Sequence, residues 1–148
     1  MRILTLSCVY LAVICVPSVA LPQSESIVEG VAAFERVDST LQVSQESQFL
    51  HVQYESFDIG VHEKVSFFQP NENSIAINQV LNSDPTQIFG QLSANGQLFI
   101  LAPGGLVIHE GATIEATSFF ASTLAVDNIK QNEARFSSSL TGITNNGK

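Results

Sequence analysis

The chain has 148 residues, with 14 acidic and 6 basic side chains and a formal net charge of −8 at pH 7. That length corresponds to one ordinary domain. An acidic chain whose few Lys and Arg residues are scattered forms no basic patch, which argues against nucleic acid or anionic lipid as a partner.

The first residues have the pattern of a secretory signal peptide. Arg2 supplies a positive start, and the apolar stretch Ile3–Val16 is too short for a spanning helix. The small residues of Ser18-Val19-Ala20 predict cleavage after Ala20. Downstream, no apolar run approaches the roughly 20 residues that a membrane span needs. We therefore expect residues 1–20 to be removed and the chain to be exported, and we do not expect an integral membrane protein.

Both cysteines of the chain, Cys8 and Cys15, lie inside the predicted signal. The processed chain would contain no cysteine, although its destination permits disulfides, so packing and hydrogen bonds alone must stabilise it. The absence of disulfides also removes a covalent obstacle to crossing a second membrane unfolded.

The segment after the predicted cut is expected to be a flexible leader, because Leu21–Glu29 is polar and contains Pro22. Alternation of apolar and polar residues then begins, which is typical of half-buried strands. Residues 74–81 fit either a strand or a single helical turn. The predicted strands of this half are Thr40–Ser44, Phe49–Tyr54 and Glu63–Phe68.

Apolar runs and turn residues continue to alternate in the second half of the chain. The dipeptide Asn95-Gly96 predicts a tight turn, since both residues tolerate positive φ. Leu98–Leu101 is apolar at every position, which indicates a strand buried on both faces, as in parallel sheets. Residues 127–136 have room for a short helix, and residues 141–148 look like the start of another strand and turn. Further strands are predicted at Leu106–Ile108, Thr113–Ala116 and Phe119–Val126.

Many short strands joined by short turns have two all-β solutions, a sandwich and a solenoid of stacked coils. Three fragments, NGQLFIL, GGLVI and GATIEA, echo one another only loosely. The residue pattern alone leaves both solutions open. In either fold we expect Phe57, Phe67, Phe89 and Phe99 in the core.

The sequence contains no arrangement of residues that is typical of catalysis or metal binding. There is no G-x-S-x-G motif, and His51, His62 and His109 lie far apart, so they are interpreted as surface or turn residues. Asp58 is expected to hydrogen-bond its own backbone in a turn. We therefore expect no catalytic residue, no metal and no cofactor.

A series of motifs between residues 41 and 136 resembles the secretion domain of two-partner secretion exoproteins. These are filamentous haemagglutinin-like adhesins, haemolysins and contact-dependent inhibition proteins. Any one motif is weak, whereas several in the correct order form a specific signal. The matching segments are YESFDIG (54–60), VSFFQPN (65–71), NQV (78–80), DPTQIFG (84–90), LSANGQLFIL (92–101), GATI (111–114) and ASTL (121–124).

The resemblance implies an all-β fold, a right-handed parallel β-helix with an N-terminal cap. Residues 21–39 would then be the leader and the start of the cap, and residues 40–148 the β-helix domain. In this family the domain is recognised in the periplasm by the periplasmic domains of an outer-membrane transporter and is then threaded outward. The chain is thus expected to pass the periplasm, to nucleate β-helix folding and to end secreted or at the cell surface, where host or neighbouring-cell surfaces are further potential partners.

The resemblance also selects candidate residues for turn formation and transporter recognition. They are Asn71, Asn78, Asn95, Gly96, Ala102, Pro103, Gly104 and Gly105. Where the family has an NPNG turn, this chain has Ala102-Pro103-Gly104-Gly105 and lacks both asparagines. We therefore expect a weaker turn or transporter contact there, and we expect Ala102→Asn with Gly104→Asn to raise secretion.

Two other functions fit an exported all-β chain. One is a carbohydrate-active β-helix enzyme, which the want of clustered acids and bases disfavours, and the other is a freestanding adhesive module of sandwich type. The terminal residues TGITNNG (141–147) resemble a coil that does not close, so the domain is interpreted as incomplete at its C-terminus.

Overall fold

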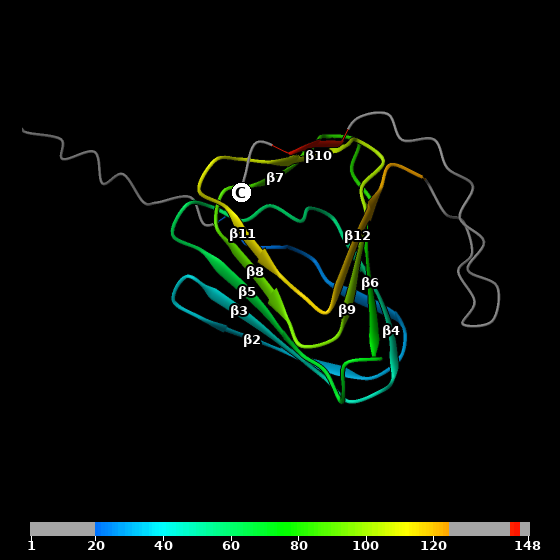
Figure 1. The fold of residues 1–148 in the computed structure, drawn as a ribbon. Helices are drawn as coiled ribbons and strands as arrows, with labels where there is room; N and C mark the ends of the chain where they lie inside the picture. Colours follow the sequence, from blue (N-terminus) through cyan, green and yellow to red (C-terminus); the bar gives the residue numbers. More distant parts are fainter. Residues whose placement is uncertain (1–19, 125–142, 146–148) are drawn as a thin grey trace, which may run out of the picture.

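In the computed structural model of the chain, residues 20–124 and 143–145 are described, and every regular element among them is a β-strand (Figure 1). The strands of the first half are β1 (Ser26–Glu29), β2 (Ala32–Val37), β3 (Thr40–Gln45), β4 (Phe49–Tyr54), β5 (Lys64–Phe68) and β6 (Ile75–Val80). Those of the second half are β7 (Thr86–Ile88), β8 (Gln91–Ala94), β9 (Gln97–Leu101), β10 (Leu106–Ile108), β11 (Thr113–Glu115), β12 (Ser118–Ser122) and β13 (Ile143–Asn145).

The strands form three sheets that lie as the sides of a triangle (Figure 1). Sheet I has the order β1-β4-β6-β9-β12, sheet II the order β11-β8-β5-β3-β2, and sheet III the order β13-β10-β7. All pairs are parallel except β1 with β4 and β2 with β3. The chain therefore winds from sheet II to sheet I to sheet III in successive coils. The predicted all-β parallel β-helix with an N-terminal cap is confirmed, and the sandwich is not adopted.

The core is built from ladders of apolar side chains that repeat once per coil. Leu41, Val65 and Leu92 are in register across β3, β5 and β8, and each is at most 1% exposed. The ladder continues to Ile114 of β11. Such stacking lets each coil bury its apolar side chains against the next and satisfies the backbone of every internal strand.

The N-terminal cap consists of β1 and β2, which close the first coil by antiparallel pairing. An uncapped β-helix would present an open sheet edge. The hairpin between β2 and β3 turns at Asp38, whose φ is 51°. The prediction of a flexible leader over Leu21–Glu29 is wrong, because Leu21 is buried in the core and Ser26–Glu29 is a strand. Its partner β4 lies about two dozen residues further along the chain, so local sequence could not show the pairing.

The structure also shows the conformation of the segments in the second half of the chain for which strands or a helix were predicted. The ambiguous segment 74–81 is strand β6. In β9, Leu98 and Ile100 point to the main core, and Leu101 on the other face joins Phe49 and Ile77 in a second apolar cluster. Phe99 packs against this cluster but is only partly buried, so its predicted core position and the burial of β9 on both faces are confirmed in part. The predicted helix over residues 127–136 lies outside the described residues. The predicted strand over residues 119–126 is β12 for the part that is described.

Two burial predictions are wrong. Phe89 is 37% exposed and stacks on His109 with ring centroids 3.7 Å apart, while Phe57 and Phe67 are buried as predicted. His51 is buried, not at the surface, and its Nε2 lies 2.9 Å from Oε1 of Gln79 on the adjacent coil. Both errors arise because side chains outside the main core can pack against the next coil: Phe89 contacts His109 at the corner between sheets III and II, and His51 contacts Gln79 on sheet I.

Candidate functional site

The candidate residues fall in two corners of the triangle and one core position. Asn71, Asn95 and Gly96 lie where the chain passes from sheet II to sheet I, which we call the II/I corner. Residues 102–105 lie where it passes from sheet I to sheet III, the I/III corner. Asn78 lies within β6. The structure therefore does not bring all the candidates into one site.

At the II/I corner, the Asn95 side chain pairs with the backbone of Gln69 on the preceding coil. The Gln69 N–H donates to Asn95 Oδ1 over 2.6 Å, and Asn95 Nδ2 donates to the Gln69 carbonyl over 2.8 Å. A carboxamide offers one acceptor and two donors, so it can take the place of a peptide group in a strand ladder. The side chain thus continues the hydrogen bonding between coils through the corner.

The Gln69 side chain in turn binds the backbone near Asn95, and we call the mutual hydrogen bonding of Gln69 with Asn95-Gly96 the interlock. Its Oε1 accepts from the Gly96 N–H over 2.9 Å, and its Nε2 donates to the Ser74 carbonyl over 3.0 Å. Gln69 was not among the predicted site residues, although it lies in the QPN motif. Local sequence could not show this role, because it depends on the register that places Gln69 against Asn95-Gly96 of the next coil.

Gly96 is required for a reason other than the one predicted. The chain turns at Asn95-Gly96 as predicted, since these two residues alone join β8 to β9, but neither has a positive φ, so the expected left-handed backbone is wrong. A Cβ at Gly96 would instead lie 2.7 Å from Gln69 Oε1 and 2.8 Å from the Ser74 carbonyl oxygen. The residue is small because the preceding coil approaches closely.

Asn71 and Asn78 occupy opposite environments. Asn71 is exposed, and its Oδ1 accepts from the Asn73 N–H over 3.0 Å, as in an Asx turn. Asn78 is 0% exposed, and its Nδ2 donates to the Phe99 carbonyl of the next coil over 3.2 Å. Asn78 is therefore not accessible to a partner in this fold and acts as an internal link between coils.

The I/III corner is held by backbone hydrogen bonds to the coils on both sides. The turn itself closes by the Gly105 N–H donating to the Ala102 carbonyl over 2.9 Å. The Thr86 N–H donates to the Gly105 carbonyl over 2.9 Å, and the Ala102 N–H donates to the Ser122 carbonyl over 2.8 Å. Gly105 has a φ of 100°, which favours glycine. Of this turn, Pro103 is the exposed residue.

The steric surroundings of Gly104 reverse one expectation from the sequence. A Cβ at this position would overlap the carbonyl oxygens of Ser83 and Asp84 on the preceding coil. Ala102 is also buried. Asparagine at these two positions would therefore disrupt the corner and would not repair it, so we no longer expect Ala102→Asn with Gly104→Asn to raise secretion.

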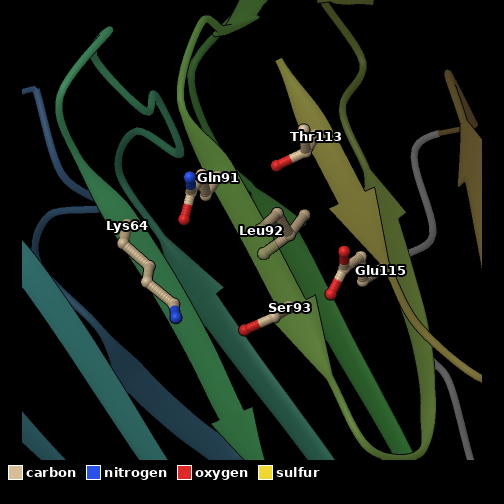
Figure 2. Close-up of a pocket in the computed structure, with 6 residues that line it drawn as sticks. All are labelled: Lys64, Gln91, Leu92, Ser93, Thr113 and Glu115. Atoms are coloured by element: carbon tan, nitrogen blue, oxygen red, sulfur yellow. The ribbon is translucent and has the colours of Figure 1, made fainter. Parts of the chain in front are cut away.

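The outer face of sheet II carries a shallow polar groove of about 180 Å³ (Figure 2). Strands β5, β8 and β11 line it, with Lys64 at one side and Glu115 at the other. The hydroxyls of Ser66 and Ser93 lie 3.0 Å apart on the same face.

Among residues 20–124 and 143–145, no group of three or more His, Cys, Asp and Glu side chains could hold a metal ion. In the same part of the chain, no helix is long and apolar enough to cross a membrane.

The cap contains an ion pair whose contribution to stability should depend on pH. Arg36 donates to both carboxylate oxygens of Glu25 over 2.7 and 2.8 Å. This hydrogen bond holds the pKa of Glu25 below its ordinary value of 4.5. Burial raises the pKa of Tyr54 far above its usual range, so its hydroxyl stays neutral.

We expect the cap to lose this contribution in acid. Because the folded-state pKa of Glu25 lies below the unfolded one, the stabilisation is fully present above pH 4.5 and is lost as the pH falls through the folded-state value. The pair is partly exposed, so Glu25→Gln should cost about 0.5–1 kcal/mol at pH 7 and almost nothing at pH 3. Thermal unfolding at both values measures this, with Glu29→Gln on the exposed strand β1 as the control. An equal cost at the two values would contradict the role of the charge.

Comparisons with known proteins agree with this architecture. The family model described as TPS secretion domain matches residues 18–148. A heme/hemopexin-binding protein of Haemophilus influenzae (strain ATCC 51907 / DSM 11121 / KW20 / Rd) is 36% identical over 112 residues, which cover 76% of this chain and 12% of that protein. A second Haemophilus influenzae protein of the same description is 34% identical over 112 residues, 75% of this chain and 12% of its own length.

A solved structure gives the same result at the level of the fold. The crystal structure of the HMW1 secretion domain from Haemophilus influenzae superposes with a TM-score of 0.73 and 28% identity, covering 85% of this chain and 35% of that chain. The chain thus spans a small fraction of the length of the curated relatives that it matches. The chain belongs to the TPS secretion domain family, whose members are the secretion-signal domains of two-partner secretion exoproteins.

Proposed function

We propose that the periplasmic domains of an outer-membrane transporter recognise this domain at its II/I corner. The supporting observation is the pair of exposed asparagines, Asn71 and Asn95, on successive coils of that corner. Beside them Phe68 at the end of β5 is 54% exposed. Amide groups held on a rigid backbone next to an apolar side chain are suited to a specific protein contact. Among the candidates at the I/III corner, residues 102–105, Pro103 alone is exposed, so these four residues are the weaker candidates.

Because of this interlock, the II/I corner has its native shape only when the coils on both sides of it have folded. Asn95 takes its position only when the coils that contain Gln69 and Gly96 are stacked. A transporter that contacts this corner would therefore bind a domain whose first coils have formed. The last coil leaves one edge of β11 and one of β12 without a neighbouring strand among the described residues, and these edges can accept a further coil of an exported chain.

The remaining parts of the function follow from this role. We propose that residues 1–20 direct export and are cut off after Ala20, and that the domain acts in the periplasm and ends secreted or at the cell surface. We further propose that the domain has no catalytic activity and no cofactor, consistent with a family of secretion domains. Adhesion to a host or neighbouring cell, as in filamentous haemagglutinin-like exoproteins, would then be an activity of the exported protein beyond this domain.

A secretion assay tests whether the transporter recognises the II/I corner. The chain is expressed with a two-partner transporter, and the medium is assayed. We expect Asn71→Ala to lower secretion by up to about tenfold, the effect of one lost polar contact. The exposed amide of Gln91, on sheet II and away from the corner, supplies the matched control Gln91→Ala. Equal secretion of both variants, with unchanged thermal stability, would refute recognition at the II/I corner.

A further inference from the structure

A buried carboxylate at the N-terminal end of the β-helix has no part in either corner. Glu63 lies just before β5 and is 8% exposed. Its Oε2 accepts from the Gly60 N–H over 2.7 Å, and its Oε1 accepts from the Ala20 N–H over 2.8 Å. Within residues 20–124 and 143–145, the one ion pair joins Arg36 to Glu25, so Glu63 has no basic partner there. A buried acidic side chain whose hydrogen-bond partners are backbone N–H groups calls for an explanation.

The chain around Ala20 is held firmly on its C-terminal side. Leu21 is 2% exposed and belongs to the main core, and the Pro22 carbonyl accepts from Arg36 over 2.7 Å. Gln23 donates its N–H to the Ser56 carbonyl over 2.9 Å. The backbone nitrogen of Leu21 is therefore fixed one residue from the nitrogen that Glu63 binds. Ala20 is also the residue after which the signal peptide is predicted to be cut.

We infer that Glu63 is the docking site for the new amino terminus of the processed chain, where the α-ammonium group of Leu21 takes the place of the Ala20 N–H. The inference rests on cleavage after Ala20 and is independent of how a transporter recognises the domain. In the cut, water adds its hydroxyl to the Ala20 carbonyl carbon, and Ala20 leaves as a carboxylate. The Leu21 nitrogen gains the hydrogen and, at neutral pH, a further proton.

The exchange strengthens the cap for an electrostatic reason. A neutral amide donor is replaced by a cation, which adds the attraction between opposite charges to the hydrogen bond, and this attraction is larger at a buried site than in water. Because the Leu21 side chain is anchored in the core, the ammonium group loses little freedom when it pairs. The uncut chain lacks this ion pair, so removal of the signal should stabilise the N-terminal end of the domain. The same burial of Leu21 implies that the peptidase acts before the cap docks.

The test uses the chain exported to the periplasm and purified after processing, with its first residue established by N-terminal sequencing. Selective acetylation of the α-amino group removes the charge and keeps an N–H donor. We expect acetylation to lower the Tm of the wild-type chain by about 3–6 °C and that of Glu63→Gln by less than about 1 °C. Glu110→Gln, which removes an exposed carboxylate, should respond to acetylation like the wild type.

A second measurement does not depend on the stability of the variant. At pH 7 the α-amino group of Glu63→Gln should react with an acylating reagent about tenfold faster than that of the wild type, since pairing with a carboxylate keeps the amine protonated. If Glu63→Gln does not fold, the acylation rate of the wild-type α-amino group is measured as a function of pH. The inference requires the midpoint of this profile to lie above the midpoint measured on the denatured chain. A first residue other than Leu21, an equal Tm loss in both chains, or a midpoint at or below the denatured value would overturn the inference.

Discussion

A chain carrying Gly104→Ala is expected to unfold with a free energy about 2–4 kcal/mol lower than that of the wild type, although it changes a surface corner by a single methyl group. The added Cβ would overlap the Ser83 and Asp84 carbonyl oxygens on the preceding coil. Backbone atoms cannot move aside as a flexible side chain can, so the coils must separate locally. Denaturant unfolding followed by circular dichroism measures the loss.

Gly111→Ala provides the comparison for this experiment. No atom lies within 4 Å of a Cβ built there, and the strain at that site comes from a φ of 87° alone. Its cost should be about 1–2 kcal/mol, the usual penalty for a non-glycine residue in the left-handed region. A Gly104→Ala chain no less stable than Gly111→Ala would show that the coils do not approach at Gly104 as described.

The second large effect is expected at the interlock of the II/I corner. Asn95→Ala removes both hydrogen bonds to the Gln69 backbone and leaves its N–H and carbonyl without those partners. Unsatisfied partly buried backbone groups cost about 1–3 kcal/mol each, and water at this exposed corner will replace part of that, so we expect a loss of about 2–3 kcal/mol. Urea unfolding at pH 7 is the appropriate measurement.

Two further variants separate the interlock from a general effect of the substitution. Asn95→Asp keeps the acceptor for the Gln69 N–H but loses the donor to its carbonyl, so it should fall between the wild type and Asn95→Ala. Asn73→Ala, at an exposed position of the same corner, should change stability by less than about 0.5 kcal/mol. If Asn95→Ala and Asn73→Ala were equally stable, the side chain of Asn95 would not link the coils.

The interlock also bears on secretion. Because Asn95 is both exposed and structural, its substitution should reduce transporter recognition and stability together, whereas Asn71→Ala should reduce recognition alone. Comparing secretion with thermal stability across the two variants therefore distinguishes a contact residue from a residue that orders the contact. This distinction is available because Asn71 has its hydrogen bond within its own turn and Asn95 has its bonds to another coil.

The sequence by itself determined the family and most of the strands from Thr40 onward, but not β1 and β2 of the cap. Apolar alternation placed the strands at Thr40, Phe49 and Lys64 within a residue of where they begin, because side chains in a strand alternate between two faces whatever the strand pairs with. The order of the motifs then selected the β-helix over the sandwich, which periodicity had left open. The unbroken apolar run at Leu98–Leu101 indicated burial on both faces, which holds for Leu98, Ile100 and Leu101, whereas Phe99 is only partly buried.

The tertiary structure alone decided the roles of the individual residues. Gln69, Glu63 and Gly104 owe their importance to atoms that lie 20 or more residues away along the chain and one coil away in space. The coils differ in length, with register partners Thr40, Lys64, Gln91 and Thr113 unevenly spaced, so no fixed period in the sequence could show which residues stack. Hence Asn78 was predicted among the recognition residues but is buried, and Leu21 was predicted in a mobile leader but closes the core. A strand pattern is a local property of the chain, whereas contacts between coils depend on register, which is set only when the coils stack.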